Sequence, residues 1–131
     1  MSARFELLHE GKGVLVYCHG NLISEDLFAV NRAIFTNDKI TQLQYYLIDL
    51  TDIHSLEISA ENLLKLARND KARLQMNPYL RLAFVTDHDV VRSVVSMWSG
   101  YIGLGDRQVR QFARRDEAFD WLEQKLPEPL A

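Results

Sequence analysis

Short apolar runs alternate along the chain with longer stretches in which apolar residues recur every three or four positions. The short runs occupy 4–8, 13–20, 44–50, 79–87 and, with more polar side chains, 106–113. Short runs rich in β-branched and aromatic residues are typical of strands. The longer stretches occupy 24–38, 59–75, 89–103 and 114–126, and their spacing is typical of helices with one buried face. The pattern predicts about five strands and about four helices.

Gly, Ser and Asp residues mark the boundaries of these elements. Gly11 and Gly13 separate the first two strands and predict a hairpin. Ser24, Ser59 and Asp116 stand where helices begin, which predicts that they act as N-caps. After the hairpin, strands and helices alternate, and this order implies parallel strands joined by right-handed crossovers. We therefore expect a layered α/β fold with a mixed sheet, whose more polar last strand lies near an edge.

The stretch 89–103 has an apolar arc that is wider than contact with one sheet requires. The arc contains Val90, Val91, Val94, Val95, Met97, Trp98, Tyr101 and Ile102. Most of these side chains are expected to belong to the core. The alternative is a groove for an apolar small molecule or a lipid, lined by Val94, Met97, Trp98 and Tyr101.

The composition is that of an ordinary globular domain. The chain has 131 residues, 47% of them hydrophobic and 25% charged, so we expect a single domain over 1–131 with a tail at 126–131. The net charge of −3 gives no general attraction to nucleic acid. No apolar run approaches the roughly 20 residues that span a bilayer, and early charged residues argue against a signal peptide. Because Cys18 is the single cysteine, a reducing compartment is expected, and we predict a protein of the bacterial cytoplasm.

The sequence shows no constellation that points to catalysis. It has no Gly-x-Ser-x-Gly or Cys-centred motif that could supply a nucleophile. His54 and Glu57 could share a metal ion, but no third ligand stands near them in the sequence, so a solvated polar segment is the favoured interpretation. We therefore expect no enzyme activity, no metal and no cofactor.

Polar side chains accumulate where the buried run at 44–50 ends. They are Thr51, Asp52, His54, Ser55, Glu57 and Ser59. In open α/β sheets, ligands bind beyond the carboxyl ends of the strands. We therefore predict that the segment 51–59, taken as a loop, is a surface that binds a protein partner.

This segment and its neighbours resemble a known signature. The stretch LIDLTDIHSLEISAENLLKLA (47–67) is similar to the motif of the STAS domain, the fold of bacterial anti-sigma-factor antagonists. Asp49 matches the aspartate of the strand, Thr51 the hydroxyl that follows it, Glu57 the acid, and Ser59 the second serine. The closing DEAFDWL (116–122) resembles the terminal helix of the SpoIIAA-like branch, which in turn resembles the lipid-binding CRAL-TRIO fold. The resemblance implies a STAS-like fold and a regulatory role through protein binding.

The chain departs from this motif at the position that matters for regulation. In the antagonists, the first serine after the acid accepts a phosphate from a kinase, and here Ile58 stands at that position. We expect Ser59 to be an N-cap that bonds to the amide of Glu61 or Asn62, and phosphorylation of Ser59 is the weaker alternative. The sequence thus predicts a non-catalytic regulatory or protein-interaction module, with an apolar-ligand or lipid-binding protein as the alternative. A homodimer is left open.

Overall fold

The computed structural model describes residues 2–37, 43–103 and 108–123. The elements in chain order are β1 (Ala3–Leu8), η1 (His9–Gly11), β2 (Gly13–Ile23), α1 (Ser24–Phe35), β3 (Tyr45–Glu57), α2 (Ala60–Met76), β4 (Arg81–Val85), α3 (Asp89–Ile102), β5 (Val109–Phe112) and α4 (Arg115–Glu123). The strands lie side by side in the order in which they occur in the sequence. β1 pairs antiparallel with β2, and the other neighbours pair in parallel. Within the described ranges, the predicted mixed α/β fold and the position of β5 at an edge are confirmed.

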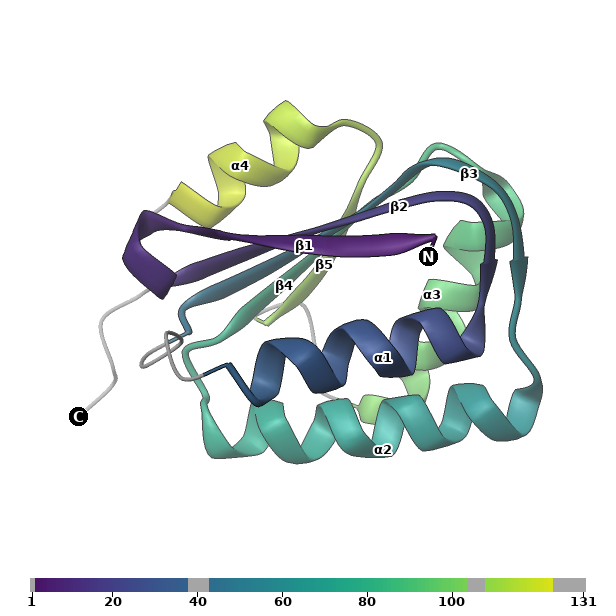
Figure 1. The fold of residues 1–131 in the computed structure, drawn as a ribbon, viewed down its shortest axis with the longest axis horizontal. Helices are drawn as coiled ribbons and strands as arrows, with labels where there is room; N and C mark the ends of the chain where they lie inside the picture. Colours follow the sequence, from purple (N-terminus) through teal and green to yellow (C-terminus); the bar gives the residue numbers. More distant parts are fainter. Residues whose placement is uncertain (1, 38–42, 104–107, 124–131) are drawn as a thin grey trace.

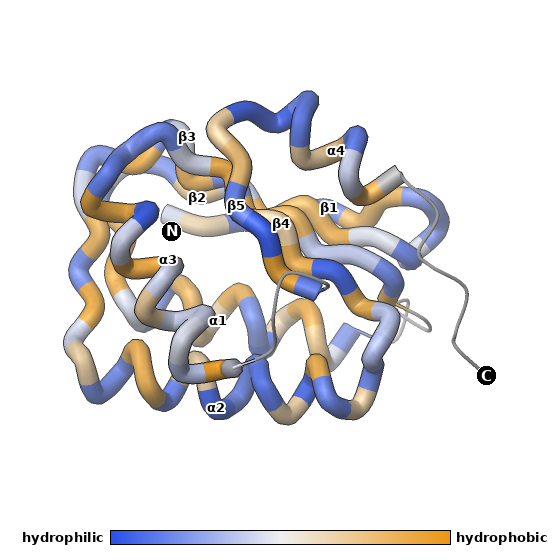
Figure 2. Tube along the Cα trace, turned by 180° about the vertical axis from the view of Figure 1, so that it is seen from behind, coloured by the Kyte–Doolittle hydropathy of each residue, from blue (hydrophilic) through white to orange (hydrophobic). Residues whose placement is uncertain are grey.

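The sheet separates two layers of unequal size (Figure 1). α1, α2 and α3 cover one face, because successive right-handed crossovers between neighbouring strands return to the same side of the sheet. Of the described helices, α4 is the one that covers the other face, where Ala118 and Trp121 pack on Leu47 and Val85. Hydrophobic segments concentrate along the sheet, whereas α2 alternates hydrophobic and hydrophilic segments along its length (Figure 2).

β2 and β3 are longer than the sequence pattern predicts. β2 continues to Ile23 and β3 to Glu57, where the pattern predicts ends at residues 20 and 50. The predicted loop at 51–59 is therefore wrong over most of its length. Polar residues there alternate with the buried Ile53, because one side of a strand can face solvent while the other packs on the core. β4 is shorter than predicted, at Arg81–Val85.

The apolar arc of α3 is narrower than predicted. Val91, Val95, Trp98 and Ile102 are buried. Val90, Met97 and Tyr101 are 75%, 50% and 44% exposed, because a helix on a sheet buries only the side that faces it. The core position of Trp98 is confirmed: it is 3% exposed, and its ring meets the edge of Phe84 at a centroid distance of 4.9 Å.

Of the three predicted helix caps, Ser59 is confirmed, and Ser24 and Asp116 are wrong; Asp116 is the second residue inside α4 (Arg115–Glu123). The Ser59 side chain accepts a hydrogen bond from the amide of Asn62 at 3.1 Å, as predicted. The prediction for Ser24 is wrong, because Ser24 is the first residue inside α1 and its buried hydroxyl accepts a bond from Asn62 Nδ2 at 3.1 Å. Parts of the predicted last strand and last helix, 106–107 and 124–126, and the predicted tail at 126–131 lie outside the described residues.

Candidate functional site

β2 and β3 extend together beyond the body of the sheet as a two-stranded ribbon. Its paired positions run from His19 opposite Asp52 to Ile23 opposite Glu57, and two register irregularities mark where it bends. The ribbon leads directly into the first turns of α1 and α2 (Figure 1). We call residues 19–23 and 52–57 the β2–β3 ribbon. It brings Asp52, Ser55 and Glu57 onto one structural element, as the predicted partner surface requires.

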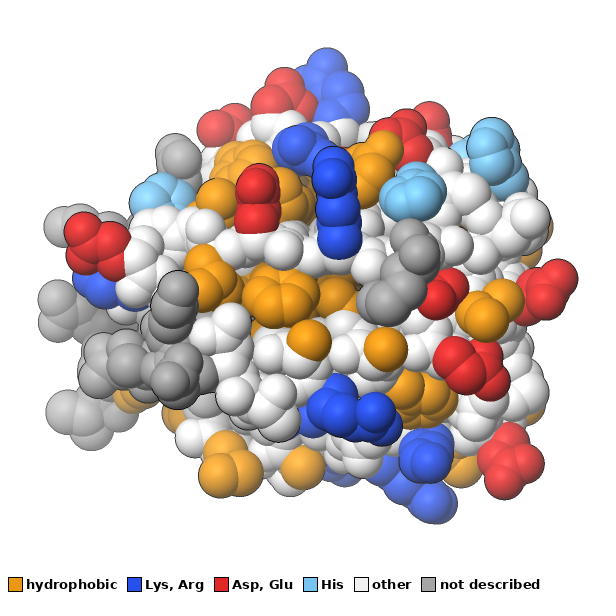
Figure 3. Space-filling view, viewed as in Figure 1, with side chains coloured by type: hydrophobic (Ala, Val, Ile, Leu, Met, Phe, Trp, Pro, Cys, Tyr) orange, Lys and Arg blue, Asp and Glu red, His pale blue; other side chains and the backbone are white. Residues whose placement is uncertain are grey.

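The outer side of the ribbon is polar. Asp52, His54 and Glu57 are exposed, Ser55 is half-buried, and Ser59 is exposed where α2 begins. Acidic and histidine side chains gather around this end of the molecule (Figure 3). The side chains of His54 and Glu57 form no hydrogen bond or ion pair with other described residues, whereas the side chain of Ser55 donates a hydrogen bond to Asn21 Oδ1 at 3.0 Å.

Asp52 is held by a tyrosine on the neighbouring strand. The Tyr17 hydroxyl donates a short hydrogen bond to Asp52 Oδ2. This bond and the nearby carboxylates raise the pKa of Tyr17, because they disfavour its ionised form. The ring of Tyr17 also stacks on His19 at a centroid distance of 5.8 Å, so Asp52 is fixed in position at the base of the ribbon.

Thr51 differs from the other predicted site residues because it turns toward a buried carboxylate. Its amide and hydroxyl donate to Asp49 Oδ1 at 3.0 and 2.6 Å, and Arg115 at the start of α4 donates to Asp49 Oδ2, with the Nε bond at 3.1 Å. Burial of Asp49 opposes its ionisation, but these bonds outweigh burial and lower its pKa. Asp49 and Thr51 therefore anchor α4 to the sheet.

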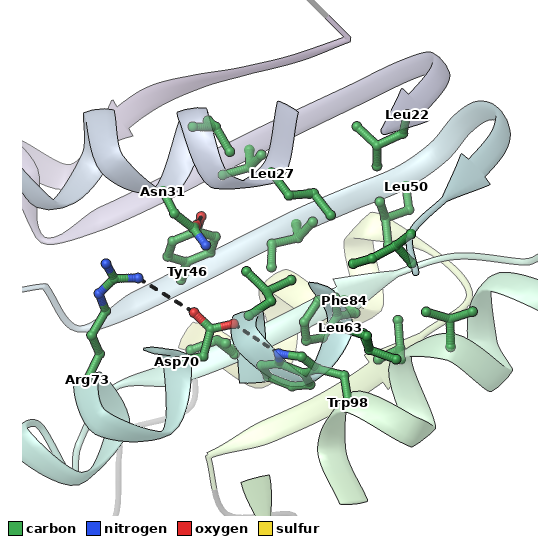
Figure 4. A pocket seen from close by; sticks show the side chains of 18 of the residues that line it. Leu22, Leu27, Asn31, Tyr46, Leu50, Leu63, Asp70, Arg73, Phe84 and Trp98 are labelled. Carbon is green, nitrogen blue, oxygen red and sulfur yellow. Dashed lines mark hydrogen bonds and ion pairs between the residues drawn. The ribbon is translucent and has the colours of Figure 1, made fainter. Parts of the chain in front are cut away.

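A cavity of about 80 Å³ lies under the ribbon, between the sheet and the layer formed by α1, α2 and α3. Its walls are mostly aliphatic, and they include Leu22, Leu27, Leu50, Leu63 and Phe84 (Figure 4). The predicted ligand residues Val94 and Trp98 line it, but Met97 and Tyr101 do not. Two of the four residues predicted to line a groove thus lie at this cavity, whereas Met97 and Tyr101 lie on the exposed side of α3. That the cavity binds a ligand stays a prediction.

The side chain of Ile58 also lines this cavity. Ile58 is half-buried and packs against the main apolar core. Two residues of the ribbon, Leu22 and Leu56, line it as well. The inner side of the ribbon and the entry to α2 are therefore walls of the cavity, while their outer side carries the polar residues.

One end of the cavity is polar. Asp70 Oδ2 accepts a hydrogen bond from Trp98 Nε1 at 2.9 Å, and Asp70 Oδ1 lies 3.7 Å from Arg73 Nη1 (Figure 4). Burial raises the pKa of Asp70 to about 6, although the bond from Trp98 and the charge of Arg73 act in the other direction. Nearby, the Tyr46 hydroxyl donates to Asn31 Oδ1 at 2.5 Å.

Sequence reasoning missed Asp70 and Arg73. A signal for Asp70 was present, because it falls at helical spacing within the apolar stripe of Leu63, Leu66, Ala67 and Leu74. A carboxylate on the buried side of a helix needs a partner. Nothing in the sequence indicates that the partner is the indole of Trp98, which comes from a different helix.

Two negative findings concern metals and membranes. Among residues 2–37, 43–103 and 108–123, no group of three or more His, Cys, Asp or Glu side chains is placed to hold a metal ion. None of the helices within the same ranges combines the length and the hydrophobicity that crossing a membrane requires.

Comparison with solved structures gives the same fold. The chain is similar to an uncharacterized protein of the DUF3478 family with a SpoIIAA-like fold from Shewanella loihica PV-4, with a TM-score of 0.59, 17% identity, and coverage of 92% of this chain and 91% of that chain. It is also similar to the anti-sigma factor antagonist SpoIIAA in its unphosphorylated form, with a TM-score of 0.65, 14% identity, and coverage of 92% and 95%. A third similar structure is the Bacillus cell fate determinant SpoIIAA in its phosphorylated form, with a TM-score of 0.60 and 17% identity. The match covers 92% of this chain and 98% of that chain.

These identities are low, and what the three structures show is the fold. No family model matches the sequence, and no curated protein matches it. The STAS-like, SpoIIAA-like fold expected from the motif around Asp49 is confirmed.

Proposed function

We propose that this chain is a non-catalytic regulatory module of the bacterial cytoplasm that acts by binding a protein partner. The observation that carries the proposal is the β2–β3 ribbon, whose exposed polar side continues into the start of α2. A likeness in fold to an anti-sigma factor antagonist supports a role in regulation through protein contact.

The proposed contact residues are Asp52, His54, Ser55, Glu57 and Ser59. His54 and Glu57 are the strongest candidates, because they are exposed and their side chains make no hydrogen bond or ion pair within the described part of the chain. Polar side chains of this kind can form new hydrogen bonds to a partner without first breaking internal ones. Thr51 has a supporting role, since both of its donors are occupied by Asp49.

The proposed module does not use a phosphorylation switch at the motif. By resemblance, the acceptor position is occupied by Ile58, which has no hydroxyl and whose side chain lines the cavity. Ser59 Oγ already accepts the amide of Asn62. A phosphate on Ser59 would also meet the negative charges of Glu57 and Glu61, which oppose it.

A capture experiment tests the proposal. The wild type, the double variant His54→Ala/Glu57→Ala, and the control variant Asn69→Ala/Glu117→Ala would be immobilised and exposed to extract from the source cell. Asn69 and Glu117 are exposed residues of α2 and α4, away from the ribbon. We expect one protein to be retained by the wild type and the control and lost by the double variant. Equal retention by all three would contradict the proposed surface.

The cavity favours a second candidate function, the binding of a small apolar molecule. A cavity lined mostly by aliphatic and aromatic side chains can accept an apolar guest. Val94 and Trp98 line this cavity, as the apolar-ligand alternative requires. A homodimer remains a prediction.

A further inference from the structure

We infer that the cavity binds an apolar molecule that carries one hydroxyl group, with the hydroxyl seated between Asp70 and Arg73. The inference rests on the second function proposed above, the binding of an apolar molecule, and names the chemical class of that molecule. It is carried by the geometry of the polar end of an otherwise aliphatic cavity (Figure 4).

The ion pair between Asp70 and Arg73 is incomplete. Arg73 Nη1 and Asp70 Oδ1 are 3.7 Å apart, which is too long for a hydrogen bond. Arg73 Nη1 is buried and has no hydrogen-bond partner in the described part of the chain. Because Trp98 already occupies Asp70 Oδ2, the second carboxylate oxygen faces the unsatisfied guanidinium nitrogen.

Neighbouring side chains hold the pair in this arrangement. The guanidinium of Arg73 lies over the ring of Phe35, with its central carbon 3.9 Å from the ring centroid. The indole of Trp98 fixes the carboxylate from the other side. The Tyr46 hydroxyl donates to Asn31 Oδ1, so this hydroxyl proton is not available to a ligand at this end.

A hydroxyl group suits this gap better than other simple polar groups. It can donate a proton to Asp70 Oδ1 and at the same time accept one from Arg73 Nη1. A carboxylate would place a second buried negative charge beside Asp70, and an ammonium group would face Arg73. An ether accepts but cannot donate, so it would leave Asp70 Oδ1 unsatisfied at a cost.

The remaining walls determine the rest of the ligand. Leu22, Leu50, Leu63 and Phe84 offer carbon atoms only, so the body of the molecule must be hydrocarbon. The Arg73 and Asp70 side chains are 32% and 14% exposed, so the polar end lies nearer to solvent than the aliphatic end. A short straight-chain alcohol, of about three or four carbon atoms, has this form and suits a cavity of about 80 Å³.

Three matched probes of a size that suits the cavity test the inference by isothermal titration of the whole chain: n-butanol, its methyl ether and n-butanoate. We expect n-butanol to bind with a dissociation constant at least about tenfold below those of the ether and the carboxylate, as one lost hydrogen bond to a charged group implies. Asp70→Asn presents a donor to the gap in place of an acceptor. The advantage of the alcohol over the ether should then fall below about threefold.

The outcomes separate the two claims. If none of the three probes binds, both the apolar-ligand function and the hydroxyl inference are overturned. If all three bind with similar affinity, or if the carboxylate binds best, the cavity is a ligand site but the inferred hydroxyl is wrong. The probe series on the wild type is decisive by itself if Asp70→Asn fails to fold.

Discussion

At the scale of single residues, two buried aspartates show how local partners decide the effect of burial. Asp49 receives bonds from Thr51 and Arg115, and these lower its pKa despite burial. Asp70 receives one neutral donor from Trp98, and Arg73 stays 3.7 Å away, so burial dominates and raises its pKa. A well-paired carboxylate stabilises the fold at neutral pH, whereas a poorly paired one destabilises it. The poor pairing of Asp70 is therefore consistent with the ligand-binding role that we propose for it.

Asp70 makes the stability of the protein fall as the pH rises. The unfolded chain releases this proton near the ordinary value of 3.8, whereas the folded chain holds it until about pH 6. Between these values the folded state binds more protons, so the free energy of unfolding decreases with pH. The wild type should lose up to about 3 kcal/mol relative to Asp70→Asn between about pH 4 and pH 7. Urea unfolding at several pH values measures this, and parallel curves for the two proteins would contradict it.

At the scale of elements, hydrophobic periodicity predicts the order and type of every strand and α-helix that the structure describes. It fails at the ribbon, because Asp52, His54 and Ser55 resemble a loop when the partner strand is unknown. Only the pairing of β3 with β2 shows that these residues belong to a strand. The site was predictable in outline, since the polar run after Leu50 is visible in the sequence. Its cavity was not predictable, because that depends on how α1 and α2 pack on the sheet.

The cap at the start of α2 gives a prediction about Ser59. Its Oγ satisfies the amide of Asn62, so Ser59→Ala should reduce the free energy of unfolding by about 0.5 to 2 kcal/mol. Ser59→Asp should stay close to the wild type, because aspartate is an equally good N-cap and favours the positive end of the helix dipole. Urea unfolding of the three proteins provides the measurement.

Partner binding distinguishes a structural Ser59 from a switch. If Ser59 is structural, both variants should retain the partner captured by the wild type. Loss of the partner in Ser59→Asp but not in Ser59→Ala, together with a phosphorylated species mapped to Ser59 by mass spectrometry, would restore a phosphorylation switch.

At the scale of the whole molecule, the two proposed functions share one structural element. Leu22, Leu56 and Ile58 line the cavity, while Asp52, His54 and Glu57 are exposed to solvent. The register irregularity between Ile53 and Ser55 shifts the alternation, so that Leu56 faces inward as Ile53 does. A ligand in the cavity would therefore contact the back of the proposed partner surface. The layer of α1, α2 and α3 encloses this cavity, whereas α4 on the opposite face contributes only to the second, smaller core.

Trp98 joins three elements around the cavity. It lies on α3, packs against Phe84 of β4, and donates a hydrogen bond to Asp70 of α2. Trp98→Ala should therefore reduce the free energy of unfolding by about 3 to 5 kcal/mol, because it removes a buried ring and leaves a larger cavity. Met97→Ala is the matched control on the same helix. Its side chain is 50% exposed and should cost less than about 0.5 kcal/mol.

Rescue by an added aromatic compound separates the loss of packing from the loss of the hydrogen bond. Indole fits the space vacated by Trp98 and carries the same N–H donor, so it should raise the melting temperature of Trp98→Ala more than benzene does. Both compounds should raise the melting temperature of Met97→Ala less than that of Trp98→Ala, because Met97→Ala leaves the native cavity unchanged and opens no additional internal space. Equal rescue by indole and benzene would mean that the hydrogen bond to Asp70 contributes little to stability and that Trp98 stabilises the fold through packing alone. A loss below about 1 kcal/mol in urea unfolding of Trp98→Ala would instead show that the ring is not part of the core.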